Sequence, residues 1–285
     1  MNALYDIPAP AKINLFLHIT GRRADGYHQL QSVFMLLDWC DTLHFERCPS
    51  GAISREDLGA VLPADDLCTR AARALQTATG CTHGAHIGIE KRIPAQAGMG
   101  GGSSDAASTL LALNRLWGLD LTCQQLESIG LSLGADVPFF LRGHNAWVEG
   151  IGEVLKPLTL STERFVVLKP PQGLDTGAIF RDKQLKRDSD PAIISGFVAE
   201  PYGFGRNDLQ PVAERLCPAI RQALGWLNAA GLRGRMTGSG SAVFARLSHG
   251  QAVDLSPAWQ AAGWQMRECS NLEVHPLCGW AASDD

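Results

Sequence analysis

The sequence predicts an α+β fold organised as two domains. Strand patterns precede helix patterns in both halves of the chain, and the steady strand–helix–strand alternation of a parallel sheet is absent. The length of 285 residues suits two ordinary domains. We expect the boundary around residues 150–170 and divide the chain into an N-terminal domain, 1–155, and a C-terminal α+β domain, 156–285.

The first expected strand covers residues 11–19. Its residues alternate strictly in polarity, which places Lys12 and Asn14 side by side on the more polar face. A turn follows at 21–26, because Asp25-Gly26 is a strong breaker. Three more strands are predicted in this half, around 32–37, 42–47 and 86–91.

Helix signals dominate the remainder of the N-terminal half. Asp66 is a good N-cap residue, and the helix that it opens should end at Gly80. A second helix follows the glycines at 98–102 and ends at Gly118. Residues 122–125 fit a capping box for a third helix that stops near residue 134. A fourth should start at Asp136, which is followed closely by a proline.

The second half begins with a hairpin that turns at Gly150 and Gly152, followed by an apolar strand at 165–169 and a linker at 169–173. Helices are expected at 176–185, 208–216 and 218–230. Strands at 232–236 and 242–247 flank a glycine-rich turn at 237–241. The highly charged segment 181–190 predicts a mobile surface loop.

Composition narrows the classes of function. A net charge of −4 does not fit a general nucleic-acid binder, which needs a basic face. There is no basic region followed by an apolar run at the N-terminus, and no apolar stretch long enough to span a membrane. The eight scattered cysteines are then expected to be reduced thiols. We therefore expect a cytoplasmic protein with small-molecule partners, no nucleic acid and no membrane. The sequence says nothing about oligomeric state.

The most informative segment is the glycine-rich run at 95–107. Three adjacent glycines, Gly100 to Gly102, disfavour strand and helix, but they suit a backbone that approaches a ligand closely. A helix start directly afterwards adds free N–H groups and a positive dipole end, which favour phosphate. The alternative is a flexible turn between strand and helix. The run lacks the lysine of a Walker A loop, and it is not a convincing dinucleotide fingerprint.

These motifs resemble a known group of enzymes. The runs at 10–15, 94–104 and 237–241 resemble, in the same order, the three motifs of the superfamily of galactokinase, homoserine kinase, mevalonate kinase and phosphomevalonate kinase. Within it, the blocks at 25–28, 134–140 and 207–209 are similar to the 4-diphosphocytidyl-2-C-methyl-D-erythritol kinases. Departures are slight: Met99 stands where leucine is expected, and Thr237 where serine is common.

The resemblance implies a two-domain small-molecule kinase fold with its active site in the cleft between the domains. It implies Asp136 as the catalytic base, or as the group that orients the hydroxyl, and Lys12 as its charged partner. It also implies an ATP site made by Pro94, Ala95, Gln96, Ala97, Gly98, Met99, Gly100, Gly101, Gly102, Ser103 and Ser104. Mg²⁺ is expected with ATP, because it neutralises the β- and γ-phosphates and takes few protein ligands. Ser104 is a candidate ligand.

The acceptor implied by the resemblance is 4-diphosphocytidyl-2-C-methyl-D-erythritol, phosphorylated at its C2 hydroxyl in the non-mevalonate isoprenoid pathway. Tyr27 and Phe180 would sandwich the cytosine, and His28 would read its polar edge. Asn14 would contact the diphosphate or the methylerythritol. Thr176, in the run that contains Phe180, joins this acceptor-binding set.

Several alternatives stay open at this point. Lys12 could be a solvated strand lysine, and Asp136 a simple helix cap worth ~1 kcal/mol. The chain could be a homoserine or mevalonate kinase, although Tyr27 and His28 would then have no nucleobase to contact. It could also be a module that binds a nucleotide without catalysis. Retention of both Lys12 and Asp136 argues against that module.

Overall fold

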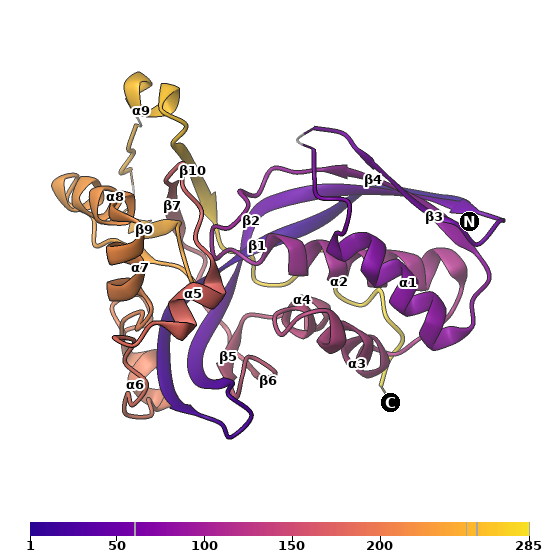
Figure 1. The fold of residues 1–285 in the computed structure, drawn as a ribbon, viewed down its shortest axis with the longest axis horizontal. Coiled ribbons are helices and arrows are strands. Elements are labelled where there is room, and N and C mark those ends of the chain that lie inside the picture. Colours follow the sequence, from indigo (N-terminus) through magenta and orange to yellow (C-terminus); the bar gives the residue numbers. More distant parts are fainter. Residues whose placement is uncertain (60, 249, 255, 285) are drawn as a thin grey trace.

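The computed structural model describes residues 1–59, 61–248, 250–254 and 256–284. The larger of its two sheets is built around two very long antiparallel strands that form a curved ribbon (Figure 1). The strand order is β3-β4-β2-β5-β6, with β1 paired along β2. The strands of this sheet are β1 (Ala3–Arg22), β2 (His28–Cys48), β3 (Ile53–Asp57), β4 (Gly84–Glu90), β5 (Ala146–Glu149) and β6 (Val154–Pro157).

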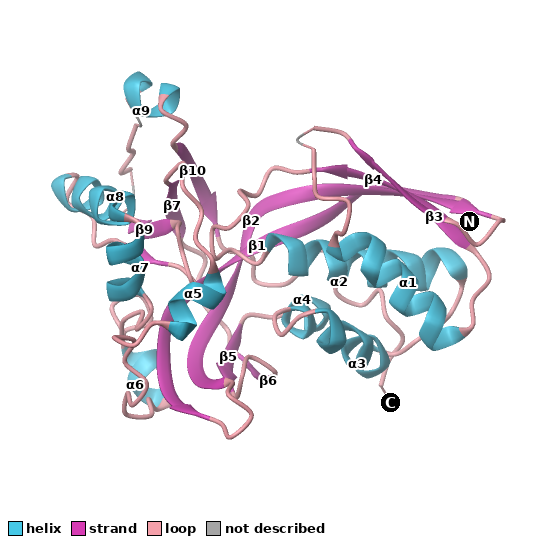
Figure 2. Ribbon diagram, in the orientation of Figure 1, coloured by secondary structure: helices cyan, strands magenta, loops and turns pink. Residues whose placement is uncertain are grey.

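Four helices of the N-terminal half lie together below this sheet in the view of Figure 2. They are α1 (Leu67–Thr79), α2 (Gly101–Trp117), α3 (Cys123–Leu133) and α4 (Val137–Arg142). Helix α2 lies at the centre, and its side chains from Ser104 to Asn114 are all buried. A helix that is buried on every side must come from a sequence rich in small and apolar residues, as this one is. This packing fixes the position of the glycine loop at its N-terminus.

The smaller sheet has the order β10-β7-β9-β8. Its strands are β7 (Arg164–Lys169), β8 (Arg235–Met236), β9 (Val243–Leu247) and β10 (Gln265–Ser270). The helices of this half are α5 (Thr176–Arg181), α6 (Ile194–Ala199), α7 (Gln210–Leu216), α8 (Pro218–Ala229) and α9 (Pro257–Ala261). Among all the helices of the described ranges, none is long and apolar enough to cross a membrane.

The two halves share strands and side chains. Leu17 and Ile19 of β1 belong to the apolar core of the C-terminal half, together with Val166 and Leu168 of β7. The last residues return to the first half, where the Leu272 N–H donates to the Leu36 carbonyl at 2.9 Å. A domain boundary between residues 155 and 156 therefore stays our proposal. Each half nevertheless receives a segment from the other: part of β1 packs in the C-terminal core, and the end of the chain packs on the N-terminal half.

Predictions from local signals were the most accurate. Asp66 caps α1 by accepting from two backbone N–H groups, Gly80 ends it in the left-handed conformation, and Thr122 forms the full capping box of α3. The strands predicted at 32–37 and 42–47 are wrong as separate elements, because both lie in β2. The segment 181–190 is also not a simple surface loop, since Leu185 and Ser189 within it are buried.

Candidate active site

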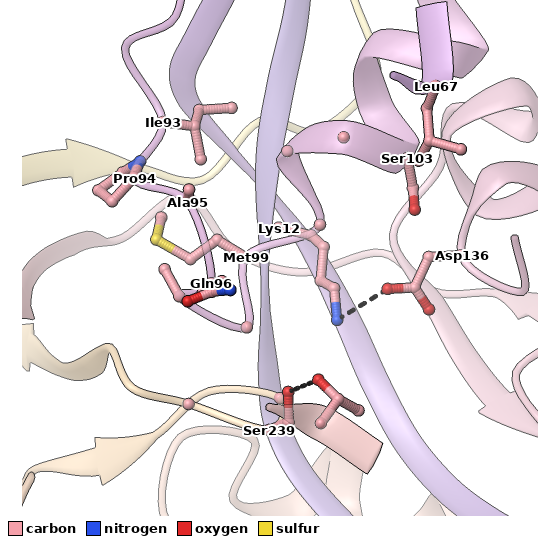
Figure 3. Close-up of a pocket in the computed structure, with 18 of the residues that line it drawn as sticks. Lys12, Leu67, Ile93, Pro94, Ala95, Gln96, Met99, Ser103, Asp136 and Ser239 are labelled. Carbon is pink, nitrogen blue, oxygen red and sulfur yellow. Dashed lines mark hydrogen bonds and ion pairs between the residues drawn. The ribbon is translucent and has the colours of Figure 1, made fainter. Parts of the chain in front are cut away.

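The glycine loop lines a cavity of about 630 Å³ where the two halves meet. All residues from Ile93 to Ser103 contribute to its lining, together with Lys12 and Asp136 (Figure 3). Gly98 and Gly100 have φ values of 71° and 70°, which side-chain-bearing residues rarely adopt. Gly100 immediately precedes the first residue of α2. The backbone of the loop therefore leads into a helix N-terminus at the wall of the cavity, as an anion site requires.

The third motif of the sequence interlocks with this loop. A Cβ atom on Gly98 would lie 2.3 Å from the carbonyl oxygen of Thr237, so only glycine fits there. The Thr237 hydroxyl lies 3.2 Å from the Gly98 carbonyl and can donate to it, and the Ala242 N–H donates to the Ala97 carbonyl at 3.2 Å. The two segments approach so closely that side chains would not fit between them, which explains why both are rich in glycine. Thr237 and Gly98, which are hydrogen-bonded here, lie 139 positions apart in the sequence.

Lys12 enters the cavity from β1. Its backbone N–H donates to the Met99 carbonyl at 2.9 Å, which ties the strand to the glycine loop. Its ammonium donates to Asn14 Oδ1 at 2.8 Å and lies 3.3 Å from Asp136 Oδ2. The same ammonium lies 4.3 Å from the centre of the Phe34 ring. Lys12 is only 4% exposed, so it is not a solvated strand lysine.

Asp136 occupies the cap position of α4 without acting as a cap. Its backbone is helical and its side chain makes no capping hydrogen bond. The carboxylate is 30% exposed and pairs with Lys12 (Figure 3). Since a capping carboxylate would be occupied by backbone N–H groups, the structure leaves this one available to a ligand. The simple cap interpretation of Asp136 is therefore wrong.

Asn14 holds the lysine in place. Its Nδ2 donates to Ser32 Oγ at 2.9 Å, which leaves Oδ1 as the acceptor for Lys12. Its backbone N–H donates to Thr237 Oγ1 at 2.9 Å. Asn14 is 1% exposed, and it lines the cavity beside Lys12. It thus joins the first and third motifs and orients the ammonium.

A second cavity, of about 590 Å³, adjoins the first. Tyr27, His28, Phe180 and three arginines contribute to its lining, and Leu30, Ala135, Ile151 and Phe180 line both cavities. Tyr27 is 61% exposed, whereas the His28 and Phe180 rings pack against each other with centroids 5.1 Å apart. The three residues predicted to bind the cytosine therefore line the same cavity, and the Phe180 ring contacts the His28 ring.

Three hydroxyl groups of the predicted site lie in different surroundings. The Thr176 and Ser239 hydroxyls are hydrogen-bonded at 2.7 Å, and both residues line the first cavity rather than the second. Ser103 lines the same cavity, whereas Ser104 does not. The Ser104 hydroxyl is fully buried and has no hydrogen-bond partner in the part of the chain that the structure describes.

Sequence reasoning missed a buried charge cluster beneath the loop. Lys91 contacts the carboxylates of Asp41 and Asp105, and it also lines the first cavity. Burial, together with the neighbouring Asp41, raises the pKa of the Asp105 carboxyl to about 7, against the opposing effect of Lys91. A Cβ atom on Gly101 would lie 3.5 Å from the Lys91 ammonium, so the cluster lies directly beside the glycine loop. No local pattern signals it, because its three members come from distant segments.

Comparison with known proteins agrees with this geometry. The model of the GHMP kinases N terminal domain matches residues 66–144, which include the glycine loop and Asp136. The model of the GHMP kinases C terminal domain matches residues 199–263. Solved structures of mevalonate kinase and homoserine kinase have TM-scores of 0.68 and 0.69 over 95% and 96% of this chain, at 14% identity. These two therefore support the fold alone.

Nearer relatives identify the branch. The 4-diphosphocytidyl-2-C-methyl-D-erythritol kinase of Paracidovorax citrulli is 66% identical, with all of both chains covered. The kinase of that name from Albidiferax ferrireducens is 67% identical and covered to 98%. A crystal structure of 4-(cytidine 5'-diphospho)-2C-methyl-D-erythritol kinase is 34% identical, with a TM-score of 0.78 over 93% of this chain and 98% of that one. The chain is therefore an ATP-dependent small-molecule kinase that belongs to the family of 4-diphosphocytidyl-2-C-methyl-D-erythritol kinases.

Proposed function

We propose that this chain transfers the γ-phosphoryl group of ATP to the C2 hydroxyl of 4-diphosphocytidyl-2-C-methyl-D-erythritol, giving the 2-phosphate and ADP in the non-mevalonate isoprenoid pathway. The observation that carries the proposal is the pair of adjoining cavities, one lined by the glycine loop and the other by Tyr27, His28 and Phe180. Because the two cavities share lining residues, one acceptor could occupy both, with its polyol beside Lys12 and its nucleobase beside His28.

Phosphoryl transfer depends mainly on positioning and on neutralising charge. Lys12 supplies the positive charge, and Asn14 holds its ammonium in the cavity that the glycine loop lines. The Asp136 carboxylate, 3.3 Å from that ammonium, would accept a hydrogen bond from the C2 hydroxyl. It would take the proton as the new P–O bond forms and as the bond from the γ-phosphorus to the β–γ bridging oxygen breaks, with ADP as the leaving group. The glycine loop would bind the phosphates of ATP through its N–H groups.

The residues at the site are compatible with Mg²⁺ arriving with the nucleotide. Within the described residues, no group of three or more acidic, histidine or cysteine side chains is placed to hold a metal ion by itself. Mg²⁺ commonly binds through one or two protein ligands, substrate phosphates and water. Ser104 stays a candidate ligand because its buried hydroxyl has no partner among the described residues, although it does not line the cavity. Ser103, which lines the cavity, is the better-placed candidate. When bound, the ion would neutralise the β- and γ-phosphates.

The position of the new phosphate ester tests this proposal. Purified protein is incubated with Mg²⁺, ATP and the CDP-linked acceptor, and the product is examined by ³¹P and ¹³C NMR. A phosphate monoester coupled to the C2 carbon, with one ADP formed per ester, is the expected product. An ester at another carbon would show that the acceptor lies differently, and the absence of any ester would reject the proposed acceptor.

A further inference from the structure

Arg187 lines the second cavity and contacts two other residues of its lining, His28 and Phe180. Its Nε donates to His28 Nε2 at 2.9 Å, which connects it to the first residue of β2. One terminal nitrogen donates to the carbonyls of Phe180 and Asp182, at 2.9 and 2.8 Å. The other donates to the Leu185 carbonyl at 3.0 Å. Arg187 makes no ion pair with any residue in the described ranges, so its guanidinium is held by carbonyl groups and one histidine.

The contact with His28 has a chemical consequence. A guanidinium has donors and no acceptor. His28 Nε2 must therefore carry a lone pair, and the ring proton must lie on Nδ1. Burial, then Arg187 and Arg22, lower the pKa of His28, which agrees with a neutral ring. In the chain as described, Nδ1 has no hydrogen-bond partner of its own, and His28 lines the cavity. The ring is thus available as a donor to a ligand.

We infer that Arg187 is a positioning residue for the choice of acceptor, because it fixes His28 as an Nδ1–H donor toward the nucleobase. The inference rests on the proposed function. The Watson–Crick edge of cytosine offers N3 as an acceptor, whereas uracil has an N–H donor at that position. A donor held in place can pair with cytosine and meets another donor in uracil. Buried polar groups left unpaired discriminate strongly between substrates.

Arg187 also connects His28 to Phe180, the residue proposed to stack on the cytosine. The Phe180 carbonyl is one of its acceptors, and the Phe180 ring packs on the His28 ring at 5.1 Å. The charged segment that contains Arg187 therefore contributes to the lining of the second cavity. A purely structural role for Arg187, holding residues 180–187 in place, would change stability without changing which base is preferred.

The test begins with the wild-type protein. Histidine ring nitrogens are recorded by long-range ¹H–¹⁵N NMR at pH 7.5, and a His28→Gln variant assigns the His28 signals. The inference requires a neutral ring protonated on Nδ1. A His28 that is protonated on Nε2, or that carries both protons, would overturn it, whatever the variants show.

The variants then separate positioning from structure. Arg187→Met should move the proton of His28 to a mixture of both nitrogens and lower the ratio of kcat/KM for the cytidine over the uridine acceptor by roughly 5- to 100-fold. KM for ATP should stay unchanged. Arg187→Lys, which also only donates, should keep more of that ratio. Arg181→Met is the matched control: it removes a charge from the same cavity wall without contacting His28, and the His28 signals should stay at their wild-type positions.

The outcomes distinguish this inference from the proposed function. If Arg187→Met lowers only the melting temperature and leaves both the His28 tautomer and the base preference intact, Arg187 is structural and the inference fails. If neither acceptor is phosphorylated by the wild type, the proposed function fails, and with it the role in acceptor choice, even where the tautomer is as expected. Should the wild type phosphorylate both acceptors equally well, base selection at His28 is refuted while the kinase activity stands.

Discussion

The Lys12 ammonium and the Asp136 carboxylate lie 3.3 Å apart, although Lys12 belongs to the first strand and Asp136 directly precedes a short helix in the middle of the chain. Neither side chain is used for an ordinary structural purpose. Lys12 is almost fully buried, and Asp136 does not cap its helix. The pair faces the cavity that the glycine loop lines, which makes it the centre of the proposed chemistry (Figure 3).

The first prediction concerns this pair. Asp136→Asn keeps the shape of the side chain and removes the proton acceptor, so turnover should fall by about 10²–10⁴-fold, the range for a positioned general acid–base group. Because Asp136 makes no capping bond, the melting temperature should change little. Lys12→Met should be similarly damaging to turnover. Near-normal turnover of Asp136→Asn would show that the carboxylate is not the base.

The second prediction concerns the glycine loop. Gly101→Val adds a branched side chain that would meet Ile93 at 3.1 Å and approach the Lys91 ammonium. The loop must then shift, and ATP should bind much more weakly. The CDP-linked acceptor should still bind, because we propose that its base is held in the second cavity. Isothermal titration with each ligand separately measures both. Unchanged affinity for ATP would favour the interpretation of the loop as a flexible turn.

The third prediction concerns the residues at the nucleobase. Wild-type protein should prefer the cytidine-linked acceptor strongly over its uridine counterpart. His28→Ala should reduce that preference, because it removes the donor. Phe180→Ala should instead weaken both acceptors by a similar factor, since stacking is worth ~1–3 kcal/mol for any base. The specificity constants of both acceptors are compared across the three proteins. A preference that survives in His28→Ala would exclude His28 as the reader of the base.

The fourth prediction concerns stability at low pH. Burial lowers the pKa of His275 to about 4. Its unfolded value is ~6.5, so the folded protein holds this proton less tightly than the unfolded chain. The free energy of unfolding is therefore unaffected by His275 above pH ~6.5. It decreases as the pH falls toward 4, by about 2 kcal/mol at pH 5. Urea unfolding at pH 7.5 and 5.0 measures the loss.

His275→Asn supplies the control for that measurement. Asparagine keeps an acceptor for the Leu277 N–H, which donates to His275 Nδ1 at 3.0 Å, and it does not titrate. The variant should therefore lose about 2 kcal/mol less stability than the wild type between the two pH values. An equal loss in both proteins would assign the acid sensitivity to other groups.

The sequence predicted well what depends on neighbouring residues. The cap at Asp66, the box at Thr122 and the glycine that ends each of the first two helices are local signals, and each is found as expected. The motifs also placed Lys12 and Asp136 together, but through resemblance and not through geometry. Their separation along the chain gives no physical reason for contact.

What could not be predicted depends on long-range contacts. β2 continues through residues 38–41, where two shorter strands were expected, because it pairs with β1 along almost its whole length. The Lys91 cluster joins three segments whose charges look like ordinary surface residues in the sequence. Arg187 lies in a charged run that predicts an exposed loop, yet its contacts reach His28 across 159 positions. Such contacts follow from the fold and not from spacing.

The most direct test of the central claim is ADP release by purified protein with Mg²⁺ and ATP, measured with 4-diphosphocytidyl-2-C-methyl-D-erythritol, mevalonate or homoserine as the acceptor. We predict steady release with the first acceptor, no more than the acceptor-free rate with the other two, and loss of the release in Asp136→Asn. Equal turnover with mevalonate or homoserine, or full release by Asp136→Asn, would contradict the account.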